Sequence, residues 1–234
     1  MQVFYAPDIK GDTYVLDDKE SRHVVKAMRM KKGSAVHLID GMGNLYNGEI
    51  AEPDPKACVI SIKSIIKEFE KRDYSLHIAI SPLKNADRFE WFIEKSVEMG
   101  IDEITPLICT NTEHQSIRKE RLNNIIVSAM KQSLKAKLTK LNDPIKFSEF
   151  ISSEQNGTRM IAHCKTGLHR DKIAGVYRAK NDAVILIGPE GDFTEAEIEE
   201  AFERGFTGIH LGPARLRTET AGIAACHSVY IINQ

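Results

Sequence analysis

The sequence predicts an α/β protein in two parts, a small β-rich part over residues 1–72 and a larger parallel-sheet part over residues 73–234. Three observations predict this division. Short strand-like segments separated by turn residues fill the N-terminal part, a run of charged residues at 67–73 follows, and strand-like and helix-like segments then alternate to residue 234. Such alternation is typical of a parallel sheet covered by helices.

The N-terminal part combines short strands with turn-forming residues. Alternating apolar and polar residues predict strands at residues 13–16, 35–39, 45–50 and 58–62. A helix or turn is expected over residues 20–30, closed by Gly33, and residues 40–44 have the composition of a hairpin turn. These segments together predict one small β-rich domain.

The C-terminal part alternates strands and helices. Strands are expected at residues 76–80, 104–109, 160–164, 184–187 and 208–211. Helices are expected at residues 86–99, 121–134, 195–204 and 221–232. Ligands of parallel sheets bind beyond the carboxyl ends of the strands, so the loops that follow these strands are the first candidates for a site.

Composition narrows the class of protein. With 42% hydrophobic and 28% charged residues the chain is ordinary globular material, which excludes collagen-like, low-complexity and wholly disordered classes. No apolar run is long enough to span a membrane, and the first residues lack a secretory signal, so a cytoplasmic protein is expected. The four cysteines lack the close pairs of metal or redox motifs, so we expect buried, reduced thiols and no metal.

A basic run near the N-terminus indicates contact with an anionic partner. Between residues 21 and 33 there are five Lys or Arg side chains and one histidine but no acid, although the net charge of the whole chain is −1. Such clusters suit a phosphate backbone, and a solvated helix face gives similar counts. The residues that could contact such a backbone are Arg22, His23, Lys26, Arg29 and Lys31.

The loop after the expected strand at 184–187 reads Gly188-Pro189-Glu190-Gly191-Asp192-Phe193-Thr194. Glycines around a proline permit a tight turn and a close approach of backbone to a ligand, but the pattern is neither a dinucleotide fingerprint nor a P-loop. Seven acids between residues 190 and 203 would repel phosphate, so a neutral or cationic small ligand is favoured. The alternative is a plain strand-to-helix turn, opened by a capping box of Thr194 and Glu197.

A second Gly-Pro loop follows the last expected strand. Residues 211–221 continue through Arg217 and Glu219 into the apolar helix at 221–232. Neither charge is buried without cost beside such a helix, so each needs a partner or a function. A structural Arg–Glu pair is the alternative to a functional pair.

These two loops together resemble the C-terminal signature of the RsmE family of SPOUT-class methyltransferases. Supporting similarities lie in Arg22-His23 to Gly33, in residues 84–100 and in the polar loop at residues 110–114. One departure stands in Lys131-Gln132-Ser133, where the family usually has an acidic residue before Gln-Ser.

The resemblance implies a fold, an activity and a set of site residues. The fold is a SPOUT-type parallel sheet with a C-terminal trefoil knot over residues 73–234, preceded by a PUA-like RNA-binding barrel over residues 1–72. The activity is S-adenosylmethionine-dependent methylation of the position-three ring nitrogen of a uridine in small-subunit (16S) ribosomal RNA, by a homodimer that needs neither metal nor membrane. The implied cofactor-binding residues are Gly188, Pro189, Glu190, Gly191, Leu211, Gly212, Leu216, Thr218, Thr220 and Ala221.

Catalysis needs little beyond positioning, because a sulfonium methyl is already electrophilic. Arg217 is expected to stabilise charge on a uracil carbonyl, and Glu219 to act as general base or to orient Arg217. Two competing functions remain open: a non-catalytic RNA-binding or ribosome-assembly protein of the same shape, and a nucleotide enzyme such as a dehydrogenase with an irregular glycine loop. Binding of S-adenosylmethionine would distinguish the methyltransferase from the non-catalytic protein. The absence of a dinucleotide-binding fingerprint argues against the dehydrogenase.

Overall fold

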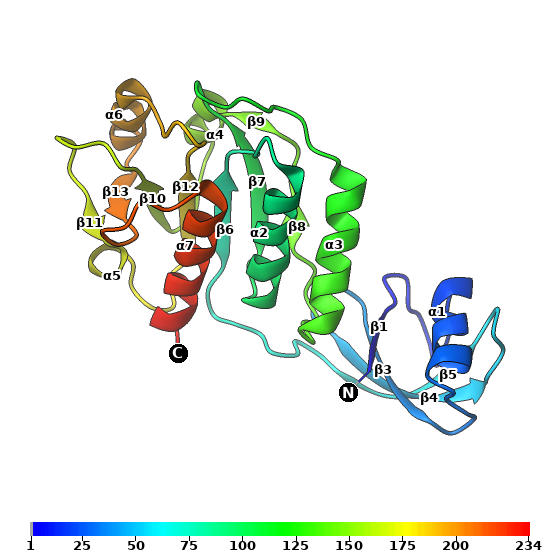
Figure 1. The fold of residues 1–234 in the computed structure, drawn as a ribbon. Helices are drawn as coiled ribbons and strands as arrows, with labels where there is room; N and C mark the ends of the chain where they lie inside the picture. The colour runs from blue at the N-terminus through cyan, green and yellow to red at the C-terminus, as the bar shows by residue number, and fades with distance from the viewer. Residues whose placement is uncertain (1) are drawn as a thin grey trace. The chain divides into compact units, whose positions relative to one another are not determined.

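The computed structural model describes residues 2–234, which form two compact units (Figure 1). The first unit ends at Lys71 and also includes Met130–Leu138, and the second comprises Arg72–Ala129 and Thr139–Gln234. The break at Lys71 falls in the charged stretch noted above. Residues 130–138, which the sequence assigns to the C-terminal part, group with the first unit because they hydrogen-bond to its backbone. The N–H of Leu138 donates to the carbonyl of Gly41, and the N–H of Gly43 donates to the carbonyl of Ala136.

The first unit contains a five-stranded sheet of order β1-β3-β4-β5-β2, in which only the β1–β3 pairing is parallel. Its elements are β1 (Val3–Tyr5), β2 (Thr13–Val15), α1 (Asp18–Arg22), a π-helical turn (His23–Ala27), β3 (Ala35–Ile39), β4 (Leu45–Glu52) and β5 (Val59–Ile66). The core of this unit is an apolar cluster that includes Phe4, Leu38 and Ile60, all fully buried. The β-rich prediction is confirmed, but β1 was not expected.

The second unit is built on an eight-stranded sheet of order β11-β13-β10-β12-β6-β7-β8, with β9 beside β7. All of its pairings are parallel, as the alternation predicts. The strands are β6 (Leu76–Ile80), β7 (Glu103–Ile108), β8 (Lys140–Leu141), β9 (Ile145–Lys146), β10 (Thr158–Ala162), β11 (Asp171–Lys172), β12 (Ala183–Ile187) and β13 (Thr207–His210). The helices are α2 (Ala86–Glu98), α3 (Lys119–Gln132), α4 (Phe147–Ser152), α5 (Ile173–Val176), α6 (Glu195–Glu203) and α7 (Thr218–Ile232).

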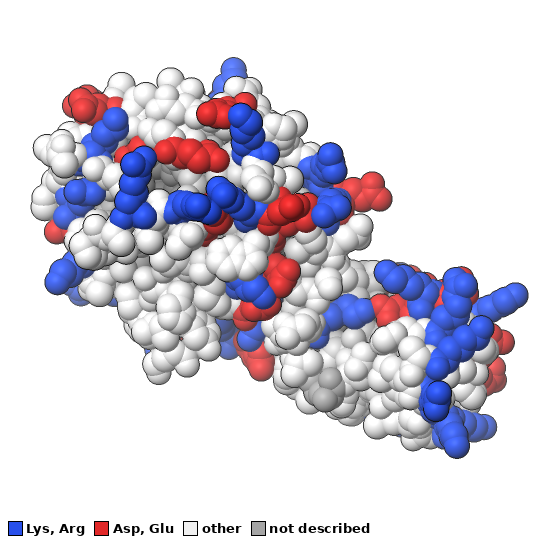
Figure 2. All heavy atoms as spheres, viewed as in Figure 1, with Lys and Arg blue, Asp and Glu red and all other residues white. Residues whose placement is uncertain are grey.

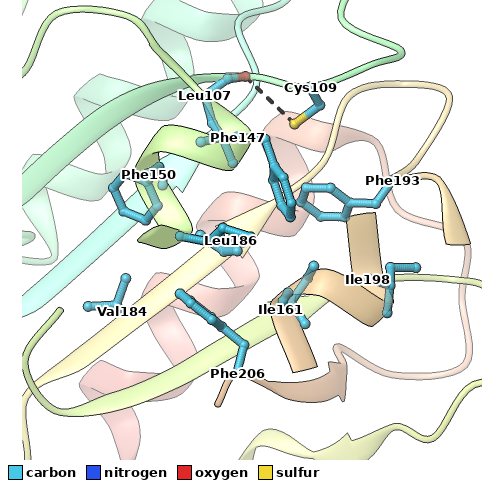
Figure 3. Packing of buried hydrophobic residues seen from close by; sticks show 13 residues of the cluster. Leu107, Cys109, Phe147, Phe150, Ile161, Val184, Leu186, Phe193, Ile198 and Phe206 are labelled. Atoms are coloured by element: carbon cyan, nitrogen blue, oxygen red, sulfur yellow. Dashed lines mark hydrogen bonds between the residues drawn. The ribbon is translucent and has the colours of Figure 1, made fainter. Parts of the chain in front are cut away.

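Helices cover both faces of this sheet. On one face, α4 and α6 enclose an apolar cluster in which the rings of Phe147 and Phe193 lie 5.6 Å apart, with Leu186 and Ile161 beneath them (Figure 3). On the other face α7 packs against α2 and β6 (Figure 1). The sheet is therefore buried on both sides, which explains why β12 consists of apolar residues only.

Gly222 sets the distance between α7 and the neighbouring elements. A Cβ at this position would lie 2.6 Å from Cε2 of Phe92 and 2.9 Å from Cδ1 of Ile80. Gly222→Ala is therefore expected to lower the free energy of unfolding by about 1–3 kcal/mol, measured by denaturant unfolding. Gly175→Ala is the control, because that helical glycine has open space around it and alanine favours a helix; equal stability of the two variants would contradict the packing argument.

His77 at the start of β6 makes the stability of the second unit depend on pH. Burial lowers the pKa of His77 to about 4 from an ordinary value of 6.5, and its Nε2 lies 2.7 Å from Oγ1 of Thr105. The unfolded chain binds this proton at higher pH than the folded chain does, so stability falls as pH falls from about 6.5 towards 4. The loss attributable to His77 is at most on the order of 3 kcal/mol. Denaturant unfolding across this pH range measures the free energy of unfolding of wild type and of His77→Gln. It should fall less steeply with pH in the variant, and identical slopes would contradict the role of His77.

Several expected features differ in detail. Cys58, Cys109 and Cys226 are buried free thiols, but Cys164 is exposed, because it follows β10 in a loop at the carboxyl edge of the sheet. Within residues 2–234 no helix is long and apolar enough to cross a membrane. The same residues contain no group of three or more His, Cys, Asp or Glu side chains able to hold a metal ion.

Candidate active site

The carboxyl ends of three neighbouring strands open onto a cavity of about 1070 Å³ in the second unit. Ala162, Ile187 and His210, the last residues of β10, β12 and β13, all line it. These strands are adjacent because β10 lies between β12 and β13 in the sheet. The cavity thus occupies the edge that the parallel-sheet rule indicates.

One wall of the cavity is the loop from Gly188 to Asp192. Asp192 has a φ of 63°, and its carboxylate accepts hydrogen bonds from the backbone N–H of Cys164 at 2.8 Å and from that of Phe193 at 2.8 Å. The side-chain amide of Asn111 donates to the carbonyl of Asp192 at 2.9 Å. A Cβ at Gly188 would lie 3.0 Å from the buried ring of Phe193. Hydrogen bonds to Cys164 and Asn111 therefore hold the loop in place. Glycine at position 188 allows the ring of Phe193 to lie close to the backbone.

The helix that follows this loop begins as the sequence predicts. Oγ1 of Thr194 accepts from the N–H of Glu197 at 3.2 Å, while the carboxylate of Glu197 accepts from the N–H of Thr194 at 2.8 Å, so the capping box is confirmed. The second carboxylate oxygen of Glu197 accepts from the N–H of Thr110 at 2.8 Å. This bond ties the polar loop at residues 110–114 to α6.

The second Gly-Pro loop also lines the cavity. Gly212 has a φ of 106°, a conformation that favours glycine, and its N–H donates to Nδ1 of His210 at 3.3 Å. Residues 212–215 and Arg217 are exposed, and Arg217 is the N-cap residue of α7. The loop therefore presents backbone groups and the exposed side chain of Arg217 to the cavity.

Glu219 lies in the first turn of α7 and is buried, with 5% of its surface exposed. Its Oε1 lies 3.8 Å from Nε of Arg88, the third residue of α2. Within the described part of the chain, no hydrogen bond or ion pair joins Glu219 to Arg217. The sequence around Arg88 contains no motif that marks it as a site residue. The packing of α2 against α7 brings it to the cavity.

The structure brings most of the expected site residues together. Of the ten expected cofactor-binding residues, all line the cavity except Leu211 and Thr220, and both expected catalytic residues, Arg217 and Glu219, line it. Its charged lining residues are Arg88, Lys165, Arg170, Arg215 and Arg217 with Glu190, Asp192 and Glu219. The acids alone suggested a neutral or cationic ligand. The added cations come from segments far apart in the sequence and suit a ligand that carries both signs of charge.

The expected RNA-binding residues lie in the first unit. Arg22, His23 and Lys26 line a hollow of about 730 Å³ together with Lys19 and Lys131. Basic side chains gather over α1 of this unit (Figure 2). Arg29 and Lys31 are exposed but do not line the hollow.

The departure at Lys131 has a local explanation. Its ammonium forms an ion pair with Glu20 and lies 5.9 Å from the ring centroid of Phe4. Lys131 thus pairs with an acid in α1 of the same unit, and the side chains of this hollow are partly fixed by that pair.

Comparisons with known proteins agree with this architecture. An RNA methyltransferase domain model matches residues 70–230, and an RNA methyltransferase PUA domain model matches residues 16–63. The fold and the cavity at the carboxyl edge of its sheet thus define an RNA-modifying enzyme with an appended RNA-binding module.

Relatives narrow the class further. "Ribosomal RNA small subunit methyltransferase E" of Buchnera aphidicola (strain APS) is 27% identical over 91% of this chain and 85% of the relative, and the Bacillus subtilis protein of that name is 25% identical over 94% and 90%. A probable rRNA-methyltransferase from Porphyromonas gingivalis has 36% identity and a TM-score of 0.93 over 100% of this chain and 98% of the other. The Neisseria gonorrhoeae ribosomal RNA small subunit methyltransferase E bound to S-adenosyl methionine has 25% identity and a TM-score of 0.88 over 100% and 98%.

The chain belongs to the RNA methyltransferase family. The resemblance to the RsmE family, drawn above from the two Gly-Pro loops, is confirmed.

Proposed function

We propose that this protein transfers a methyl group from S-adenosylmethionine to the position-three ring nitrogen of a uridine in small-subunit (16S) ribosomal RNA. The observation that carries the proposal is the cavity at the carboxyl edge of the parallel sheet, where glycine loops meet Arg217 and Glu219. The relatives named for small-subunit methylation, one of them bound to the cofactor, support it.

The residues present fit this cofactor. Gly188, Gly191 and Gly212 leave backbone groups accessible for adenine and the methionine part, while Leu216 and Ala221 offer apolar surface. When bound, the cofactor supplies an electrophilic methyl on a sulfonium. The chain has to align the uridine nitrogen and assist the loss of its weakly acidic proton.

Glu219 is the group proposed to accept that proton. Its carboxylate lies in the first turn of α7, where the partial positive charge of the helix N-terminus favours an anion, and it lines the cavity. Arg217 is exposed and lines the cavity, and it donates to a uracil carbonyl as charge develops there. Because Glu219 contacts Arg88 and not Arg217, the role of general base is preferred to that of orienting Arg217.

The remaining expectations complete the proposal. Residues 1–72 act as the PUA-like RNA-binding domain, and residues 73–234 as a SPOUT domain whose C-terminal loops form a trefoil knot. The enzyme works as a homodimer in the cytoplasm.

The deciding experiment is incubation of the protein with unmodified small-subunit RNA or small subunits and methyl-labelled S-adenosylmethionine, followed by mapping of the modified nucleotide. Label on the position-three nitrogen of one uridine is the expected result. Tight RNA binding without cofactor binding or label transfer would instead identify a non-catalytic RNA-binding or assembly protein.

Gly191→Val is expected to weaken binding of S-adenosylmethionine and to leave RNA affinity nearly unchanged. A Cβ at Gly191 would lie 3.2 Å from Cβ of Asn111, whose amide holds the loop, so the branched side chain displaces the loop through Asn111. Calorimetric titration with the cofactor measures the effect, and thermal unfolding checks that the variant is folded. Unchanged cofactor affinity in a folded variant would remove this loop from the site.

A further inference from the structure

Arg88 and Glu219 are neighbours in the cavity lining that do not form a closed ion pair. Their nearest approach is 3.8 Å, whereas two other arginine–carboxylate pairs of this unit are closed, with 2.7 Å between Arg72 and Asp102 and 2.5 Å between Arg121 and Glu90. The side chain of Arg88 is 42% exposed, and both members of the open pair line the cavity. Within residues 2–234 no other hydrogen bond or ion pair is found for either side chain.

The position of Arg88 is unfavourable unless an anion lies near it. It is the third residue of α2, in the first turn, where the partial positive charge of the helix N-terminus repels a cation. Negative charge near it comes from Asp87 in the same turn and from Glu219 in the first turn of α7. A purely structural pair would gain most from direct hydrogen bonds, so the open geometry leaves one donor group and one acceptor group side by side for a third partner.

The uracil edge is complementary to such a pair. Its position-three nitrogen carries a hydrogen-bond donor, and the two flanking carbonyls are acceptors. A carboxylate beside a guanidinium offers an acceptor for the N–H and a donor for the neighbouring carbonyl. Cytosine presents an unprotonated ring nitrogen and an amino group at these places, so it would meet the pair with the wrong polarity.

We propose that Arg88 is a catalytic residue that, together with Glu219, reads the uracil edge and stabilises the charge that develops when the ring nitrogen loses its proton. The proton passes to the carboxylate of Glu219. The electron pair of the nitrogen forms the new bond to the methyl carbon, and the sulfur–methyl bond breaks with its electron pair remaining on sulfur. Arg88 donates to one carbonyl of the uracil and Arg217 to the other. The inference rests on the proposed function and assigns a residue to it.

The test compares Arg88→Ala, Arg88→Lys and the control Arg121→Ala in single-turnover methylation of small-subunit RNA. The control breaks an ion pair between α2 and α3 that lies outside the cavity lining. Arg88→Ala should lower the rate about a hundredfold, the scale of losing one preorganised donor, with unchanged calorimetric affinity for S-adenosylmethionine. Arg88→Lys should recover part of the rate, because an ammonium keeps the charge but lacks the planar fork.

Two further measurements separate chemistry from structure. RNA carrying 5-fluorouridine at the target has a more acidic ring nitrogen, so the loss caused by Arg88→Ala should shrink on that substrate. In the double variant with Glu219→Gln the two losses should not add, because the residues act as a unit. A rate for Arg88→Ala equal to the control's would overturn the inference. A loss of cofactor affinity that accounts for the lower rate would also overturn it, by assigning Arg88 to the cofactor's carboxylate. Failure of the proposed function itself is distinguishable, because the wild-type protein would then transfer no label.

Discussion

Replacement of Arg217 by alanine is expected to lower the single-turnover methylation rate by about a hundredfold or more and to change cofactor affinity little. The exposed guanidinium at the N-cap of α7 lines the cavity, where it can donate to a uracil carbonyl whose charge grows as the proton leaves. Arg217→Lys should recover only part of the loss, since a guanidinium holds two acceptors in one plane and an ammonium does not.

The control for this prediction is Arg178→Ala, which removes an exposed arginine outside the cavity lining of the same unit. Rapid-quench measurement of label transfer gives the rate, and calorimetry gives the affinity for the cofactor. A fully active Arg217→Ala enzyme would show that the guanidinium has no part in the reaction and would leave Arg88 as the candidate donor.

Simultaneous replacement of Lys26, Arg29 and Lys31 by alanine should weaken RNA binding and reduce its dependence on salt. Removing one cation that neutralises a phosphate should change the slope of log affinity against log salt by roughly 0.7–0.9, so removing three should change it by about 2–3. All three side chains are exposed, so the substitutions leave the apolar core intact. Lys26 also lines the hollow of the first unit.

The matched control replaces Lys10, Lys56 and Lys67, which are exposed in the same unit and remove the same charge. Fluorescence titration of labelled RNA over a salt series measures both slopes. If the two triple variants have the same slope as wild type, the basic run at residues 21–33 is a solvated face and does not bind phosphate.

Signals between residues near each other in the sequence were sufficient for much of the fold. The alternation of strands and helices beyond residue 73 predicts the parallel sheet, and the capping box of Thr194 and Glu197 predicts the start of α6. The two Gly-Pro loops were identified as candidates because each follows a predicted strand of the parallel sheet, and both line the cavity. Turns, caps and periodicity are local, so a single sequence contains them.

Other features were decided only by the tertiary structure. The placement of β10 between β12 and β13 brings the loops together, and the packing of α2 beside α7 brings Arg88 to Glu219. The grouping of residues 130–138 with the first unit is a further case. These arrangements arise because apolar faces of distant segments must be buried against one another, and the spacing of residues within one segment does not specify which distant face will cover it.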